Sequence, residues 1–286
     1  MTALLLASFG WSGDARTEAA RGPEFAAPRL ESGASEDARA ALADNTDEER
    51  AAADAVEDVD EDASDEREDA GEDAGEDEAA EDVDAEPATR AAGKILALKD
   101  KIYENLRETR YQHRTYVRRR QGVYRWDCSA MVAWFLQRVA PVAHAAVDRP
   151  RPVARDYYRV IKRSSTRRWR DGWRRLEHIE DARPGDLFAW IRPPDFPSRN
   201  TGHVGFVLEP ARRYPALPNA YTVRILDATS LPHGDDTRAR DGEGGIGEGT
   251  LLFLTDGEGR GTAYGWFGAD SRGVIATDIV FGRVRR

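Results

Sequence analysis

The spacing of apolar residues predicts amphipathic helices and strands from about residue 90 onward. Apolar side chains recur three and four positions apart over 91–109, again after Asp127, and in a shorter stretch over 153–162. This spacing is typical of helices that bury one face. We therefore predict three helices, of which the second begins next to Asp127.

Alternating apolar and polar residues predict strands in the second half of the chain. The expected strands are 187–190, 203–208, 221–228, 250–255, 262–267 and 274–284. The segments 107–125, 140–152 and 233–249 show neither pattern and are expected to be loops. Helices followed by a run of strands predict an α+β fold, with helices packed on a central antiparallel β-sheet.

Two parts of the chain have opposite net charges. Residues 31–89 contain 26 acidic and 3 basic residues, a net charge of −23, whereas residues 90–286 contain 36 basic and 23 acidic residues, a net of +13. The acidic part has no aromatic residue and few large aliphatic ones, so it cannot bury enough surface to offset its conformational entropy. We expect an acidic disordered linker over 31–89 and one folded domain over 90–286, and we interpret the linker as a solvating segment. The sharper hypothesis is an electrostatic lid that folds back on the basic domain.

Residues 1–30 are expected to form a leader. The apolar run after Met1 has the length of an export-signal core but lacks a basic start, so we interpret it as a truncated export signal. The expected location is periplasmic or secreted, with the cytoplasm as the alternative. No later stretch approaches the roughly 20 apolar residues of a membrane-spanning helix.

Cys128, the only cysteine, follows Asp127 at the predicted start of the second helix. Aspartate is a good N-cap because its carboxylate accepts from the unpaired N–H groups of the first turn. A thiol in that first turn lies at the positive end of the helix dipole, which favours the thiolate. We therefore predict that Cys128 is an acidified nucleophile.

His203 is the best candidate for a base, because it begins a predicted strand and glycines flank it, leaving space for a substrate. Asp227 ends the next strand, where its carboxylate can accept from an imidazole N–H. A cysteine on a helix followed by a histidine and an acceptor on successive strands is the order that a papain-like triad requires. His233 is the alternative third member. The remaining histidines, His113, His144 and His178, have no evident partner and are expected at the surface.

Three short motifs together resemble the NlpC-type cell-wall cysteine peptidases. They are Asp127-Cys128-Ser129-Ala130, Pro184-Gly185-Asp186-Leu187 and Gly202-His203-Val204-Gly205, and the similarity covers roughly residues 95 to 230. The chain departs from the family pattern in having an aspartate as third triad member, an alanine after Asp-Cys-Ser, and no Tyr-x-Trp-Gly-Gly sequence before the cysteine.

The resemblance implies a papain-like domain that cleaves amide bonds in peptidoglycan stem peptides. Cys128 would be the nucleophile, His203 the acid and base, and Asp227 the residue that orients the imidazole. In that family a tyrosine upstream of the cysteine helps to shape the site, and we assign this position to Tyr111 over Tyr124. The expected substrate-binding residues are Tyr111, Asp127, Ser129, Gly202 and His233.

Two other classes of function stay open. The same triad could serve an acyltransferase or amidase, and a non-catalytic module could bind an anionic envelope polymer through the basic stretch 167–175, which contains Trp169 and Trp173. The plainer interpretation of that stretch is a solvated surface whose tryptophans pack on the core. We expect a monomer, no nucleic-acid partner and no cofactor, and no Cys/His cluster has the spacing of a zinc site.

Overall fold

The structure, a computed structural model, describes residues 86–238, 242, 244–267, 271 and 273–286. The predicted leader over 1–30 and all but the last residues of the acidic linker over 31–89 lie outside this range. The helices are α2 (Arg90–Asn105), α3 (Cys128–Val139), α4 (Pro141–Ala145) and α5 (Ala154–Arg163), with short 3₁₀ turns at η3 (Arg119–Gln121) and η4 (Ile179–Asp181). The three predicted helices are thus present, and α4 is additional.

Strands form two sheets. The small sheet contains β1 (Glu108–Tyr111), β2 (Tyr116–Arg118) and β3 (Val123–Trp126). The large sheet contains β4 (Trp173–Leu176), β5 (Leu187–Ile191), β6 (Gly202–Val207), β7 (Arg212–Arg213), β8 (Ala220–Thr229), β9 (Gly245–Thr255), β10 (Gly261–Gly265), β11 (Val274–Ala276) and β12 (Ile279–Val284). Along the large sheet the strands run β11-β10-β9-β8-β6-β5-β12-β4, with β7 beside β8, and the pairs are antiparallel. The α+β class with an antiparallel sheet is therefore confirmed.

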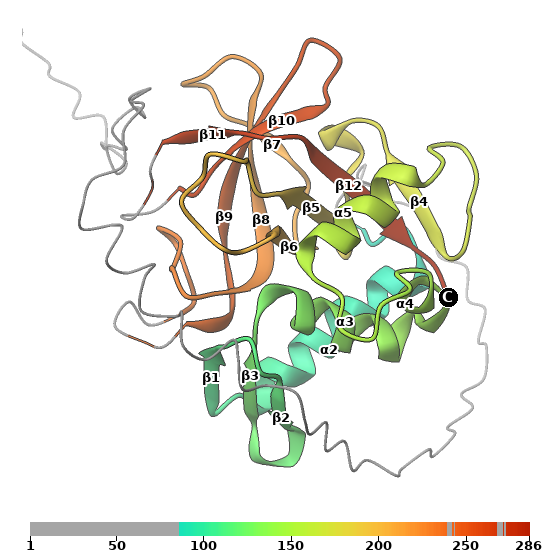
Figure 1. Cartoon of the computed structure of the whole chain (residues 1–286), viewed down its shortest axis with the longest axis vertical. Helices are drawn as coiled ribbons and strands as arrows, with labels where there is room; N and C mark the ends of the chain where they lie inside the picture. The colour runs from blue at the N-terminus through green and yellow to red at the C-terminus, as the bar shows by residue number, and fades with distance from the viewer. Residues whose placement is uncertain (1–85, 239–241, 243, 268–270, 272) are drawn as a thin grey trace, which may run out of the picture.

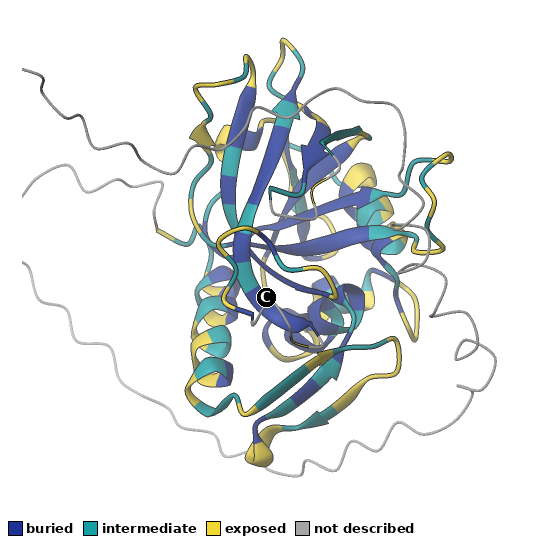
Figure 2. Cartoon of the chain, turned by 90° about the vertical axis from the view of Figure 1, so that its left-hand side faces the viewer, coloured by how far each residue is buried: buried dark blue, intermediate teal, exposed yellow. Residues whose placement is uncertain are grey.

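The large sheet separates two cores. Helices α2, α3 and α5 cover one face, where Val204 and Phe206 of β6 join Cys128 and Phe135 of α3 in the helix-side core. The other face curls around an aromatic core of its own, in which Trp190 of β5 stacks on Tyr264 of β10 at 4.2 Å between ring centroids. These two strands are far apart in the strand order, so the contact requires a strongly curved sheet. Figure 2 shows the resulting buried band through the sheet and the inner helix surfaces.

Three of the predicted loops contain regular structure. Segment 107–125 forms the small sheet, because Tyr124 and Trp126 alternate inward along β3 while Arg125 pairs outward with Glu108 at 2.6 Å. Segment 140–152 contains α4, which begins at Pro141, a residue that the first turn of a helix accepts. The expected strand 274–284 is divided into β11 and β12, which pair with different strands.

The third predicted loop, 233–249, is a strand from Gly245 onward, and its glycines explain the error. A Cβ at Gly247 would lie 2.5 Å from the Arg238 side chain, and one at Gly249 would lie 2.5 Å from the His233 ring. Alternate glycines on one face of β9 thus leave room for two large side chains that cross it. Among the described residues, no helix is both long and apolar enough to cross a membrane.

Candidate active site

The start of α3 is built as predicted from Asp127. Its Oδ1 accepts from the backbone N–H of Ala130 at 2.8 Å and from the hydroxyl of Ser129 at 2.7 Å, so Asp127 is the N-cap. Its second oxygen contacts Nδ1 of His113 at 3.2 Å. His113 is exposed, as expected, but it does have a partner, since β1 and the residues after it bring this histidine against the cap. Ser129, expected to bind substrate, is buried and directs its hydroxyl to Asp127.

The thiol of Cys128 lies in the first turn of α3 but is not acidified. Burial raises the pKa of this thiol well above its usual value, and the charge of Asp127 raises it further. The backbone amides of Val204 and Ser129 oppose this shift without overcoming it. The prediction of an acidic thiol was wrong because loss of hydration outweighs the N–H groups that the helix start supplies. At rest Cys128 is a protonated thiol.

His203 and Asp227 form a buried hydrogen-bonded pair across neighbouring strands. Nε2 of His203 lies 2.8 Å from Oδ2 of Asp227, and the Asp227 side chain is fully buried. The carboxylate accepts this bond, so Nε2 carries the proton and Nδ1 is the acceptor nitrogen when the ring is neutral. Strands β6 and β8 pair at Phe206–Leu226 and Val207–Ile225 and separate toward His203. Val204, whose backbone amide acts to lower the pKa of Cys128, follows His203 at this opening.

The thiol and the imidazole approach the same part of β6 from different cores. Side chains alternate along a strand: Val204 joins Cys128 in the helix-side core, whereas the His203 ring packs 5.1 Å from Trp190 and 5.6 Å from Trp266. Among the contacts of the described residues, no hydrogen bond joins Cys128 to His203. The structure thus brings His203 and Asp227 together and packs Cys128 in the same core as Val204, the next residue of β6. The charge of Asp227 also raises the pKa of the thiol.

His233 contacts the Asp227 carboxylate but does not take the place of Asp227 as the partner of His203. Its Nε2 lies 3.2 Å from Oδ2 of Asp227, and its Nδ1 lies 3.1 Å from the carbonyl oxygen of Trp266. Both partners are acceptors, so both ring nitrogens donate and the ring is an imidazolium. Burial lowers the pKa of His233, but the charge and hydrogen bond of Asp227 outweigh it, and the pKa is raised overall. Asp227 is therefore the residue bonded to His203, and His233 supports Asp227.

Arg238 and Trp266 also shape the site, and neither was predicted from the sequence. Arg238 donates to the Asp227 carboxylate, to its carbonyl oxygen at 2.9 Å and to Gly247 O at 3.0 Å. Although burial opposes ionisation, Arg238 and His233 hold the pKa of Asp227 well below its usual range. Trp266 stacks on the His233 ring at 4.4 Å. The alternating glycines of β9 were the signal that a large side chain lies across this strand.

Two other predicted substrate-binding residues differ in what surrounds them. Burial, with the charges of Cys128 and Asp127, raises the pKa of Tyr111 well above its usual value, so its hydroxyl stays protonated and is able to donate. Tyr124 instead lies in the core beside Trp126. Gly202 has a φ of 144°, and a Cβ there would lie 1.9 Å from Trp190 O. Close approach of β5 therefore accounts for this glycine, and the expected open space for substrate is filled by backbone.

The remaining expectations concern His178, the two tryptophans of the basic stretch 167–175, and metal binding. His178 contacts the carbonyl oxygen of Glu258 at 2.7 Å through Nδ1, so it too has a partner. Trp173 is buried and donates to Ala143 O at 2.8 Å, and Trp169 lies between the guanidinium groups of Arg174 and Arg285. In the described part of the chain, no group of three or more His, Cys, Asp or Glu side chains is arranged to hold a metal ion.

Comparisons with known proteins give no family for the chain. No protein-family model matches it, and neither a curated protein nor a solved structure resembles it closely enough to be a match.

Proposed function

We propose that the chain is a cysteine hydrolase that cleaves amide bonds with Cys128 as nucleophile, His203 as acid and base, and Asp227 as the orienting residue. The observation that carries the proposal is the buried His203–Asp227 pair, whose bond through Nε2 leaves Nδ1 as the proton acceptor. Nδ1 is the ring nitrogen nearer the main chain, and the backbone amide of Val204, the residue after His203, acts to lower the pKa of the Cys128 thiol.

The reaction would begin from a neutral pair. Cys128 transfers its proton to Nδ1 of His203 as its sulfur attacks the carbonyl carbon, and Asp227 stabilises the imidazolium through Nε2. The Cys128 N–H and the protonated Tyr111 hydroxyl are donors for the developing oxyanion. The imidazolium then protonates the leaving amine, and a water activated by His203 releases the acyl group. A side-chain rotation of Cys128 closes the pair while His203 keeps its bond to Asp227, since catalytic hydrogen bonds often tighten only with substrate bound.

The substrate class follows from the resemblance alone. NlpC-type enzymes act on peptidoglycan stem peptides, and we propose the same substrate, a papain-like arrangement of the domain, and a location in the cell envelope. The Ala130 position and the aspartate at 227 depart from that family, so the exact amide bond is left to experiment.

The test is digestion of purified peptidoglycan and of synthetic stem peptides by the full chain, read by mass spectrometry. Cys128→Ala and His203→Ala should each lower turnover at least about 10²-fold while preserving the fold. His178→Ala, at a histidine bonded only to a distant loop, is the matched control and should keep full activity.

Three outcomes would contradict the proposal. They are intact substrate with the unaltered chain, full activity in Cys128→Ala, or an acyl group transferred to an acceptor amine in place of hydrolysis. Alkylation of the resting thiol by iodoacetamide should be slow at neutral pH and rise only in alkali, because the pKa of Cys128 is raised. Fast alkylation below about pH 6 would instead indicate a preformed thiolate–imidazolium pair.

A further inference from the structure

The strongest feature outside the site is an arginine-rich face formed by residues 149–175 together with Arg285. Residues 149–175 contain 11 basic and 2 acidic residues, a net charge of +9. Helix α5 and residues 164–172, which lead into β4, carry most of these side chains. In Figure 1, α5 and β4 lie on the opposite side of α2 and α3 from the small sheet β1–β3.

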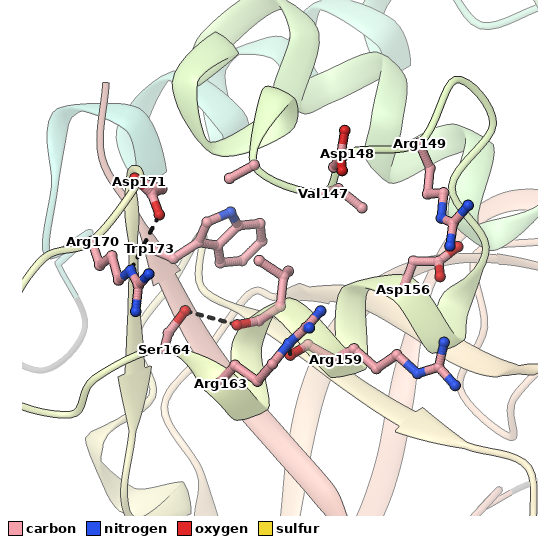
Figure 3. Close-up of a pocket in the computed structure, with 12 residues that line it drawn as sticks. Val147, Asp148, Arg149, Asp156, Arg159, Arg163, Ser164, Arg170, Asp171 and Trp173 are labelled. Atoms are coloured by element: carbon pink, nitrogen blue, oxygen red, sulfur yellow. Dashed lines mark hydrogen bonds and ion pairs between the residues drawn. The ribbon is translucent and has the colours of Figure 1, made fainter.

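A cavity of about 550 Å³ opens on this face. Figure 3 shows Arg149, Arg159, Arg163 and Arg170 around this cavity, whose wall also contains Trp173. Of the three acidic side chains in its wall, Asp156 accepts from the Val153 N–H at 3.0 Å and Asp171 lies 3.4 Å from Arg170.

Few carboxylates neutralise the guanidinium groups around the cavity. Within the described residues, no carboxylate pairs with Arg159 or Arg163, and both are exposed. An excess of cations around a concave surface attracts an anionic polymer.

The chain itself supplies such a polymer next to this face. Thr89, the last residue of the acidic segment 31–89, caps α2 and donates its hydroxyl to Val284 O at 2.8 Å. Arg285, the residue directly after β12, donates its backbone N–H to Gly172 O at 2.9 Å and places its guanidinium over the Trp169 ring. The net charge of −23 is therefore tethered beside the net charge of +9.

We propose that the acidic segment 31–89 docks in cis on the arginine-rich face and excludes other polyanions from it. A random coil of 55 residues, the length of 31–85, spans about 40 Å, compared with a radius of gyration of roughly 16 Å expected for a 197-residue domain, so reach is no obstacle. Tethering gives an effective concentration on the order of millimolar, so that even weak ionic contacts are populated at low salt. This proposal does not depend on the proposed catalytic function.

The test places a spin label in the acidic segment of the full chain. Ser64→Cys carries the label in a Cys128→Ser background, and line broadening of backbone amides is measured by NMR. Amides of α5 and of residues 165–175 should broaden at about 50 mM salt and recover at about 0.5 M, where the screening length is only a few ångströms.

Matched charge removal locates the contact. Arg159→Gln, Arg163→Gln and Arg170→Gln combined should abolish the broadening, with amide dispersion of the domain showing that it stays folded. The control removes equal charge from the small sheet, with Arg114→Gln, Arg118→Gln and Arg120→Gln, and should leave the broadening unchanged.

The proposal is overturned if broadening is absent at low salt, if it centres on residues 114–120, or if it persists in the Arg159, Arg163 and Arg170 variant. Binding of added heparin or DNA at the same face with no cis broadening would also overturn it and assign the face to an external polyanion.

Discussion

Asp227 concentrates the charge of the site in one buried carboxylate. It accepts from His203 at 2.8 Å and from His233 at 3.2 Å, and Arg238 donates to its other oxygen. A buried carboxylate is costly unless it is paired and hydrogen-bonded. With the pKa of Asp227 held low and that of His233 raised, these two groups form a buried ion pair.

His233→Gln tests this arrangement through pH. A raised folded-state pKa means that the His233 imidazolium stabilises the fold fully below the unfolded pKa of about 6.5, and that this contribution is lost as pH rises through the folded pKa. The free energy of unfolding of the unaltered chain should therefore exceed that of His233→Gln most at about pH 6, and the gap should narrow in alkali. Urea titrations across pH measure it; a gap that is constant or widens with pH would show that the ring is neutral.

At the scale of elements, one ion pair joins strands distant in sequence. Arg283 of β12 donates through Nε and a terminal nitrogen to both oxygens of Asp186, at 2.9 and 2.8 Å, just before β5. Burial raises the pKa of Asp186 despite Arg283, so desolvation offsets much of the attraction. The Pro-Gly-Asp-Leu motif thus has a structural task here, since Gly185 also approaches Ala92 of α2 too closely for a side chain.

Removal of one partner should be costly because it leaves a buried charge unpaired. We expect Asp186→Ala to lower the free energy of unfolding by about 3–5 kcal/mol, measured by chemical denaturation. Glu209→Ala, which breaks the exposed pair with Arg212, is the control and should cost at most about 1 kcal/mol. Equal losses in the two variants would mean that the buried pair adds nothing specific.

At the scale of the whole molecule, opposite charges are segregated along the chain. The acidic segment 31–89 has the composition of a disordered chain, whereas the basic domain contains two cores on either side of one sheet. Segregation of this kind allows one part of the chain to act on the other through salt-dependent contacts.

Limited proteolysis with a glutamate-specific protease tests this division. Cuts within 31–85 should precede any cut within 90–238 and leave a resistant fragment that begins near Pro87, because cleavage requires a locally unfolded backbone. Mass spectrometry of the early products identifies the sites. Simultaneous cleavage in both regions would show that the acidic segment is as ordered as the domain.

The sequence by itself determined the elements whose signal is local. The helix that begins at Cys128, its Asp127 cap, helices α2 and α5, and the strands that carry His203 and Asp227 all follow from periodicity and capping, which act over a few residues.

Only the tertiary structure decided what surrounds each group. Burial of Cys128 reversed the expected effect of the helix start on its pKa, and the alternation of β6 directed the side chains of Val204 and His203 to different cores. The side chains of Arg238 and His233 pack against the glycines of β9, and no local sequence pattern encodes these contacts. Desolvation and long-range contacts depend on segments far apart in sequence, so they arise only when the sheet curls and its two faces are covered.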